Sequence, residues 1–291
     1  MDIPRFPECR PLDIGDQPRF DAAFAADPPE ISEFTFTNLY AWRDAYGLRV
    51  SALDGFLIVS ALKDGVKSYF KPAGTGDSEA VFSRIAAERA PFIRIPEGMA
   101  DIVRRVTGFT AREDRDNADY VYSCPALIEL KGKSFDGKRN LIKKFRSRYR
   151  YEYIGLDQGS SEDCLDFQEL WCITKGCGDE RGLAREHEAV LTMCRHFSLF
   201  GLCGGAIRVE GRICAICVGQ RLNADTMVMH VLKAFPDMPG LYQAMHNEFL
   251  SREAPGYAFV NMEQDLGLEG LRKAKLSYHP VRMVNKFTLV P

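Results

Sequence analysis

The sequence lacks any apolar run of the ~20 residues that a membrane-spanning helix requires. Its first residues, MDIPRFPECRPLDIGDQPRF, also lack the apolar core of a secretory signal peptide. The nine cysteines are therefore expected to be reduced thiols in a soluble, cytoplasmic protein. The formal net charge is only −2, so a site for a polyanion must be local rather than spread over the whole surface.

The cysteines and histidines do not have the spacing of a metal site. Cys214 and Cys217 form the C-x-x-C pair of RICAICVGQ, which reads as a strand, where side chains three apart point to opposite faces. Cys172 and Cys177 are five residues apart, and His187 lies too far from the next histidine for a helical zinc site. We expect no bound metal and interpret the cysteines as core thiols.

Two segments of the chain share one order of predicted elements. Residues 47–62 read as two strands around an Asp-Gly turn, and 204–222 as two strands around a Glu-Gly turn. A third strand follows each pair, at 68–71 and at 226–233. Helix, strand and helix come next, and the pieces ERAPFIRIPE and REAPGYAFVNME match at Ala-Pro and at the final acid.

Helices are predicted ahead of each set of strands, over 16–26 and 37–46 in the first half and over 137–148 and 161–175 in the second. The order α-α-β-β-β-α-β-α-β resembles that of the GNAT acyltransferase fold, here in tandem. The resemblance implies a mixed α/β (α+β) protein, with two mixed, mostly antiparallel sheets flanked by helices. We place the domain boundary near Cys124-Pro125, which gives domains 1–124 and 125–291. No Pro-rich linker separates the two, so we expect the halves to pack closely.

The stretch YAFVNMEQDLGLEGLRKAKLSYHPVRMVNKF reads as a strand, an acidic turn, a short cationic helix and a final strand. Glu263 and Asp265 follow the strand, and Arg272, Lys273 and Lys275 lie on the helix. Ligands of mixed α/β folds bind at such strand ends, so this pattern is suited to a phosphate and a reacting amine or acyl group. The alternative is a solvated helix end whose basic residues only complement the helix dipole.

Residues 131–150 form a basic segment, with nine Lys or Arg residues and one acid, a local charge of +8. Leu141, Ile142 and Phe145 have helical spacing, and alternating tyrosines then indicate a strand. Such a helix attracts phosphate backbones or an anionic membrane surface. The alternative is an ordinary surface helix whose long basic stems cover apolar neighbours. The candidate polyanion-binding residues are Arg139, Lys143, Lys144, Arg146 and Arg148.

The turn that would hold the pyrophosphate of coenzyme A is poor in glycine. In HVLKAFPDMPGLYQAMHNEF only Gly240 remains, while Pro236 and Pro239 remove backbone donors and Asp237 repels phosphate. This argues against acetyl-CoA, although a glycine at a helix N-terminus still suits a phosphate. The candidate donor-binding or phosphate-binding residues are Lys233, Gly240, Tyr242, Arg272 and Lys273.

Three motifs carry a resemblance to a known family: SEFTFTNLYAWR, KRNLIKKFRSRYRYEY and FVNMEQDLGLEGLRKAKLSYHP. They resemble the bacterial phosphatidylglycerol lysyltransferase C-terminal-type domains, which are similar in fold to the Fem-type peptidoglycan amino-acid transferases. The resemblance implies transfer of an aminoacyl group from charged tRNA to a lipid, peptide or small amine or hydroxyl acceptor. Gly270, Leu271 and Lys275 match the Fem-type G-L-x-x-x-K pattern, whose lysine meets a phosphate. The membrane-embedded region of the lipid-modifying relatives has no counterpart in this sequence.

An aminoacyl ester is already activated, so neither a covalent enzyme intermediate nor a cofactor is expected. The site must orient the acceptor, take its proton and stabilise the oxyanion. Glu263 and Asp265 are the candidates to orient or deprotonate the acceptor, and Lys275 is the candidate to neutralise negative charge. His230 is a further candidate base, with a structural role as its alternative. Two other functions stay open, an acyl-CoA-dependent N-acyltransferase and a non-catalytic binding protein.

Overall fold

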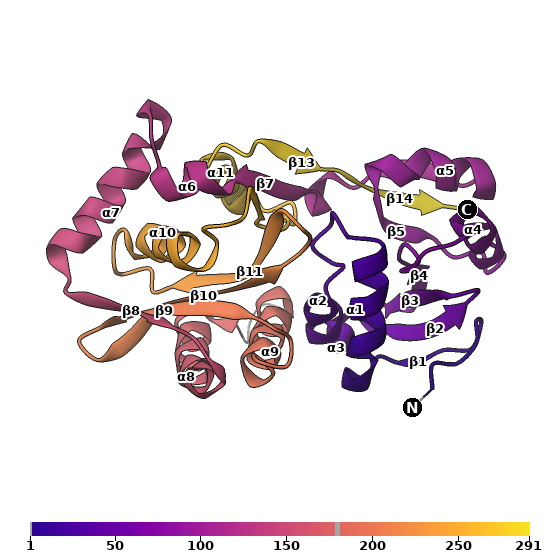
Figure 1. Ribbon diagram of the computed structural model, residues 1–291, viewed down its shortest axis with the longest axis horizontal. Coiled ribbons are helices and arrows are strands. Elements are labelled where there is room, and N and C mark those ends of the chain that lie inside the picture. Colours follow the sequence, from indigo (N-terminus) through magenta and orange to yellow (C-terminus); the bar gives the residue numbers. More distant parts are fainter. Residues whose placement is uncertain (1, 178–180) are drawn as a thin grey trace. The chain divides into compact units, whose positions relative to one another are not determined.

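The computed structural model describes residues 2–177 and 181–291 (Figure 1). The chain forms two compact units, each with its own seven-stranded sheet. The first unit contains the chain up to Tyr120 together with Glu263–Lys273 and Met283–Pro291, and the second contains Val121–Met262 and Ala274–Arg282.

The first sheet has the strand order β1-β2-β3-β4-β5-β14-β6. Its strands are β1 (Arg10–Pro11), β2 (Arg49–Leu53), β3 (Phe56–Lys63), β4 (Val66–Tyr69), β5 (Phe92–Pro96), β6 (Thr110–Glu113) and β14 (Lys286–Val290). The helices of this part are α1 (Gln17–Ala26), α2 (Phe36–Ala41), α3 (Arg43–Tyr46), α4 (Ser78–Ala86) and α5 (Glu97–Thr107), with short 3-10 turns η1 (Ile14–Asp16) and η2 (Arg115–Asn117). Phe82, Phe92, Ile95 and Leu289 are fully buried at its core.

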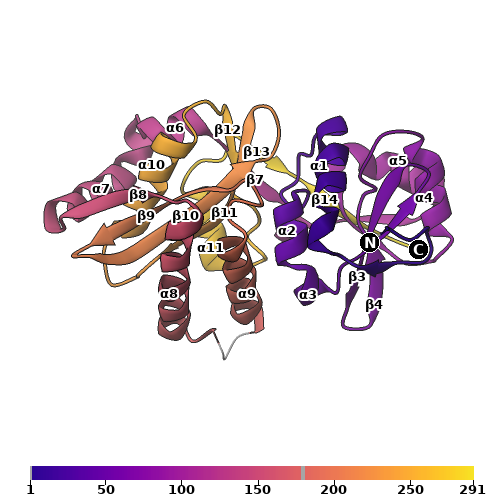
Figure 2. The same ribbon diagram turned by 60° about the horizontal axis from the view of Figure 1, so that its bottom comes forward.

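The second sheet has the strand order β13-β7-β12-β11-β10-β9-β8. Its strands are β7 (Asp119–Ser123), β8 (Tyr151–Gly155), β9 (Cys203–Val209), β10 (Arg212–Arg221), β11 (Thr226–Ala234), β12 (Phe259–Asn261) and β13 (Arg282–Val284). Its helices are α6 (Cys124–Glu129), α7 (Asp136–Arg148), α8 (Gln158–Lys175), α9 (Arg181–Arg195), α10 (Leu241–Glu253) and α11 (Glu269–Leu276), with the 3-10 turn η3 (Lys133–Phe135). Helix α10 covers one face of this sheet, and α8 and α9 cover the other (Figure 2).

A parallel strand pair lies within each sheet. In the second sheet β12 pairs in parallel with the start of β11, from Thr226 to Val228. Strand β11 then continues to Ala234, where only β10 accompanies it. The corresponding pair in the first sheet is β4 with β5, joined at Tyr69 and Phe92. Beyond Val228, β11 therefore has one edge without a strand partner in this sheet.

The turns predicted from sequence are confirmed. Asp54 and Gly55 join β2 to β3 with positive φ of 49° and 87°, and Glu210 and Gly211 join β9 to β10 with φ of 50° and 82°. Positive φ at both central residues is the requirement of the tight hairpin turn that matches strand twist. The C-x-x-C pair lies on a strand, β10, as predicted, and the mixed α/β class is confirmed. Helix α9 was not predicted.

The division of the chain differs from the predicted domains 1–124 and 125–291. The last strand, β14, lies in the first sheet between β5 and β6, and β7 lies in the second sheet beside β12. Backbone pairing explains the difference, because β14 bonds to β5 on one edge and to β6 on the other. Without it, two strands would leave their N–H and C=O groups unpaired. Each repeat therefore supplies a strand to the other repeat's sheet.

The expectation of nine reduced thiols is wrong for one pair. Helix α8 ends at Lys175, and the next residue, Gly176, has a φ of 68° that turns the chain back. Cys172 and Cys177 form a disulfide across this turn. The other seven cysteines are free. Burial raises the pKa of Cys194 to about 12, as expected for an inert core thiol. Within the described residues, no helix is long and apolar enough to cross a membrane, and no three metal-ligating side chains cluster.

Candidate active site in the second unit

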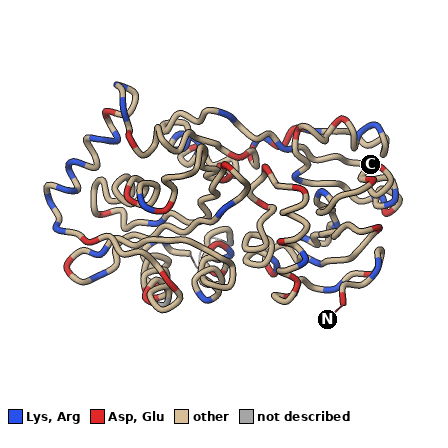
Figure 3. Tube along the Cα trace, viewed as in Figure 1, with Lys and Arg blue, Asp and Glu red and all other residues tan. Residues whose placement is uncertain are grey.

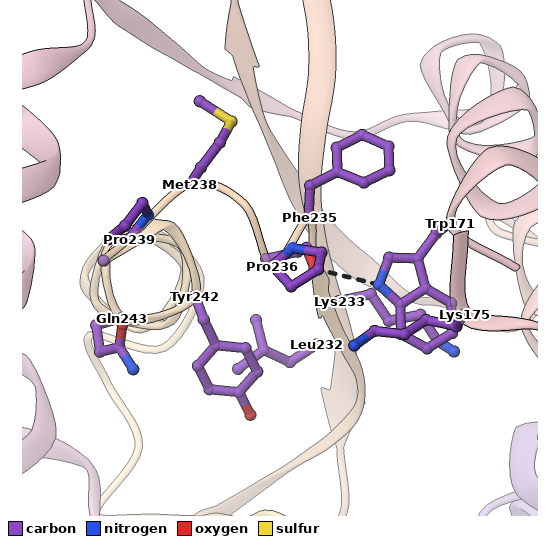
Figure 4. A pocket seen from close by; sticks show the side chains of 12 residues that line it. Trp171, Lys175, Leu232, Lys233, Phe235, Pro236, Met238, Pro239, Tyr242 and Gln243 are labelled. Atoms are coloured by element: carbon purple, nitrogen blue, oxygen red, sulfur yellow. Dashed lines mark hydrogen bonds between the residues drawn. The ribbon is translucent and has the colours of Figure 1, made fainter. Parts of the chain in front are cut away.

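A pocket of about 370 Å³ opens in the second unit where β11 ends and α10 begins (Figure 4). Its walls come from the end of α8, the end of β11, the turn after it and the first turn of α10. The lining residues are Trp171, Lys175, Leu232, Lys233, Ala234, Phe235, Pro236, Met238, Pro239, Gly240, Tyr242 and Gln243. The predicted donor-binding residues Lys233, Gly240 and Tyr242 are thus brought together here.

One wall of the pocket is held by Trp171 and Lys233. The ammonium of Lys233 lies 2.9 Å from a carboxylate oxygen of Glu186 and 3.7 Å from the centre of the Trp171 ring. The indole N–H of Trp171 donates to the carbonyl of Ala234 at 3.2 Å (Figure 4). Burial lowers the pKa of Lys233, whose side chain is almost completely enclosed. This wall is rigid, because each polar group in it has a partner.

The rim of the pocket carries polar groups that the rest of the unit leaves available. Lys175 is exposed, and no carboxylate in the described part of the chain pairs with it. Lys175 follows Trp171 by one helical turn, so both side chains lie on one face of α8. Across the pocket, Tyr242 and Gln243 project from the first turn of α10 (Figure 4). The exposed fraction of Tyr242 is 37%.

Gly240, at the start of α10, fixes the basic helix beside the pocket. Its φ is +91°, and a Cβ there would lie 2.0 Å from the carbonyl oxygen of Leu141 and 3.1 Å from the Cβ of Phe145, both on α7. Only glycine fits, so α7 packs directly on the N-terminus of α10. No side chain caps this helix end, and the backbone N–H groups of Tyr242 and Gln243 have no acceptor among the described residues. Such a terminus favours negative charge.

The outer face of α7 is cationic, and its inner face is apolar. Ile142 and Phe145 are buried against the unit, whereas Lys143, Lys144 and Arg148 are exposed, with no acid paired to them in the described part of the chain. Figure 3 shows basic residues along this helix. A polyanion-binding role for these three residues stays a prediction.

Two of the predicted polyanion-binding residues are used to hold the structure. Arg146 donates to Glu248 at 2.8 Å and to the hydroxyl of Tyr151 at 3.1 Å, which ties α7 to α10 and β8. Arg139 donates to the carbonyls of Leu130 and Gly132 and pairs with Asp136. Their guanidinium groups are therefore less available to a ligand than the exposed cations of α7.

Asp265 and Arg272 form a buried ion pair in the first unit. Asp265 is fully buried and accepts two hydrogen bonds from Arg272, at 2.8 and 2.9 Å, one from the Tyr120 hydroxyl at 2.5 Å and one from the Gly267 N–H. Burial alone would raise its pKa, but these hydrogen bonds outweigh that effect and hold the pKa well below its usual range. Arg272 also bonds to Asp116 at 2.8 Å. This geometry favours a structural role over proton transfer or phosphate binding.

Glu263 and Lys275 also make contacts that hold the chain near β12. Glu263 accepts from the side-chain amide of Asn38 at 3.2 Å in the first unit. In the second unit the ammonium of Lys275 donates to the carbonyl of Met262, and the carbonyl of Lys275 accepts from the Tyr122 hydroxyl at 2.9 Å. Lys275 thus ties the end of α11 to the residue after β12.

The remaining predicted residues lie apart from the pocket lining. His230 lies on β11 but is not among the residues that line the pocket, and Lys273 is exposed on the part of α11 that belongs to the first unit. Of the four predicted catalytic residues, Glu263 and Asp265 belong to the first unit, and His230 and Lys275 belong to the second.

Sequence reasoning missed four residues around the pocket: Trp171, Lys175, Glu186 and Gln243. The i, i+4 spacing of Trp171 and Lys175 on a predicted helix was a usable signal that they share a face. No pattern along the chain shows that this face meets the end of β11, because that contact depends on how the helix packs.

The sequence matches the family model "Phosphatidylglycerol lysyltransferase, C-terminal" over residues 27–290. The chain belongs to this family. It is similar to a conserved protein of unknown function from Bacteroides thetaiotaomicron, at 32% identity and a TM-score of 0.90, with 97% of this chain and 98% of the other covered. No curated protein matches it.

Two more distant structures share the fold. The L-PGS structure from Bacillus licheniformis has a TM-score of 0.68 at 14% identity, with 100% of this chain and 94% of that chain covered. FemX has a TM-score of 0.59 at 9% identity, with 98% and 97% covered. The predicted family and the tandem GNAT-like fold are confirmed, and the family is one of transferase domains.

Proposed function

We propose that the chain is an aminoacyltransferase, which takes an aminoacyl group from a charged tRNA and passes it to an amine or hydroxyl acceptor. The packing of Gly240 on α7 carries this proposal, because it sets a cationic helix beside a pocket within one unit. The family's name supports the reaction class.

A charged tRNA has two chemically different parts that this site suits. Its phosphate backbone is a polyanion, which the exposed cations Lys143, Lys144 and Arg148 would bind with release of counterions. Its reactive end is a small aminoacyl ester, which suits a concave, partly apolar site. The pocket at the start of α10 is partly open to solvent and has aromatic walls and a cationic rim.

The turn after β11 is a poor site for the pyrophosphate of coenzyme A. Pro236 and Pro239 have no N–H, and the N–H of Leu241 is already bonded to the carbonyl of Met238 at 3.1 Å. Asp237 adds a negative charge to the same turn. These features favour the tRNA donor over acyl-CoA.

The reaction needs little covalent chemistry from the protein. The acceptor's lone pair attacks the ester carbonyl, the bond to the ribose oxygen breaks, and that oxygen takes up the proton that the acceptor loses. In this proposal the N–H groups of Tyr242 and Gln243 face the developing oxyanion. Lys275 acts as a positioning residue through the Met262 carbonyl. Glu263 and His230 remain candidates for proton transfer.

The direct test is incubation with total tRNA charged with labelled amino acids, together with cell extract. We expect label to enter a lipid, peptide or protein fraction. Acetyl-CoA, supplied with the same extract, should give no acetyl transfer. Transfer from acetyl-CoA alone would support the N-acyltransferase alternative, and no transfer from either donor by folded protein would favour a binding protein.

A triple variant, Lys143→Ala, Lys144→Ala and Arg148→Ala, tests the role of α7. We expect at least a tenfold loss of tRNA affinity at low salt, and a log–log salt dependence that is shallower by about two to three units, because up to three phosphate contacts are removed. The control removes the same charge from exposed residues of the first unit, Lys63, Arg89 and Arg112. Equal affinities for the two variants would contradict the proposal, and competition by anionic vesicles but not by tRNA would indicate a lipid surface instead.

A further inference from the structure

We propose that the pocket selects an aminoacyl group with an uncharged, apolar side chain and rejects a lysyl group. The inference rests on the proposed function, since it names the donor class for the same site. It also separates this chain from the lysyl chemistry in the family's name.

The charges around the pocket disfavour a cationic side chain. None of the lining residues is acidic, and two of them, Lys175 and Lys233, are lysines. The nearby carboxylate of Glu186 lies 2.9 Å from the ammonium of Lys233 and is already paired. Asp237 lies in the turn that contributes to the pocket, but it is not one of the lining residues. A lysyl ammonium in the pocket would therefore lie beside two like charges and meet no carboxylate among the described lining residues.

The pocket wall is aromatic and apolar where a side chain would lie. Trp171 is fixed by its bond to the Ala234 carbonyl and by Lys233 above its ring. Phe235 is buried and packs against Phe167, with ring centres 5.0 Å apart. Burying an apolar side chain against fixed rings is favourable and costs little rearrangement of the protein.

The polar groups at the start of α10 suit the part that all aminoacyl donors share. Gln243 is one of the residues that line the pocket, and its side-chain amide has no hydrogen-bond partner among the described residues. It can accept a hydrogen bond from the donor's α-ammonium. Lys175, at the exposed rim, is suited to the terminal phosphate of the donor rather than to its side chain. One set of residues would thus recognise the part that all aminoacyl donors share, and another set would distinguish their side chains.

The test is calorimetric titration of the full chain with four amino-acid amides: L-leucinamide, L-phenylalaninamide, L-lysinamide and L-glutamic acid 1-amide. All four share the α-ammonium and the carbonyl, so only the side chain differs. We expect L-leucinamide or L-phenylalaninamide to bind at least tenfold more tightly than either charged amide. Preference for L-lysinamide or for the glutamate amide, equal binding of all four, or no binding of the apolar amides would overturn the inference.

A charge reversal at the rim provides a second, independent measurement. Lys175→Glu should increase the affinity for L-lysinamide at least fivefold and change that for L-leucinamide less than twofold. The matched control is Lys63→Glu, an exposed lysine of the first unit, which should change neither. No gain for L-lysinamide in Lys175→Glu would contradict the charge argument. Binding of uncharged tRNA, measured on the same proteins, separates this result from a failure of the proposed function.

Discussion

Helices α4 and α10 occupy equivalent positions in the two repeats, yet their N-termini differ. The carboxylate of Asp77 caps α4 by accepting the Ala80 N–H at 3.0 Å. The turn before α4 is held to β3 by two bonds between Leu57 and Ala73, each 2.9 Å. Helix α10 has no such cap, and its first turn lines a pocket. In the first repeat an aspartate caps the helix N-terminus, whereas in the second repeat the helix N-terminus has no side-chain cap and is available to a ligand.

The charged groups of the two units follow the same contrast. In the first unit the fully buried Lys286 lies 2.6 Å from both Asp119 and Glu33, and Asp265 is paired with Arg272. In the second unit the outer face of α7 carries cations with no acid beside them among the described residues. The paired charges inside the first unit stabilise its fold, whereas the exposed cations of α7 are the ones proposed to bind a polyanion.

Gly240→Ala should have the largest effect, because it disrupts the packing of the α10 N-terminus against α7. A Cβ cannot be placed 2.0 Å from the Leu141 carbonyl, and φ of +91° is strained for alanine. We expect a loss of about 4 kcal/mol in unfolding free energy, from overpacking plus backbone strain. Because α7 must move, tRNA affinity should also fall at least tenfold in the fraction shown to be folded by near-UV circular dichroism. Unchanged affinity would mean that α7 and the pocket act separately.

Asp265→Asn should destabilise the first unit while leaving tRNA binding intact. The change removes the buried negative charge that Arg272 and Arg115 contact, while Arg272 keeps Asp116 as an acidic partner, so we expect a loss of about 1 to 3 kcal/mol. The pKa of Asp265 is lowered in the folded state, so its contribution is present above the unfolded-state pKa of about 3.9 and is lost as pH falls. Urea unfolding at pH 7 and pH 3 should therefore show a smaller difference between variant and wild type at the lower pH. Loss of tRNA binding by folded variant would instead give Asp265 a direct role at the ligand.

His246, buried on α10, should contribute an acid-sensitive term to the second unit. Burial, with the charges of Lys138 and Lys275, lowers the pKa of His246 from 6.5 to about 3. The unfolded chain takes up the proton first, so stability falls as pH drops from 6.5 towards 3. By pH 4.5 the loss from this group is about 2 to 3 kcal/mol. His246→Phe should remove that slope in urea unfolding series, and an unchanged slope would mean that the histidine reaches solvent.

Asp77→Ala should have the smallest effect and tests the capped helix end of the first repeat. Loss of a helix cap costs about 1 kcal/mol, so thermal unfolding should shift by only a few degrees. Asp77→Asn keeps an accepting oxygen and serves as the control. Neither change should alter binding of tRNA or amino-acid amides, since α10 forms the pocket. A change in either binding would show that the first repeat also takes part.

The sequence allowed good prediction of whatever depends on neighbours along the chain. The local patterns include the Asp-Gly and Glu-Gly turns and the basic helix with its apolar stripe. The position of Gly240 between a strand and the start of a helix is a further local pattern. The roles of Asp265 and Lys233 were not predictable in this way. Their partners, Tyr120 for one and Glu186 with Trp171 for the other, come from distant elements, and a charged residue reads the same in sequence whether it is paired or free.

The exchange of β7 and β14 between the sheets has a consequence for synthesis and for evolution. The first sheet cannot be completed until Lys286–Val290 has left the ribosome, so the half made first must wait for the strand made last. Cutting the gene near codon 124 would produce two fragments, each missing a strand of its own sheet. The two repeats therefore form one folding unit, in which each repeat can differ in function while it still needs a strand from the other.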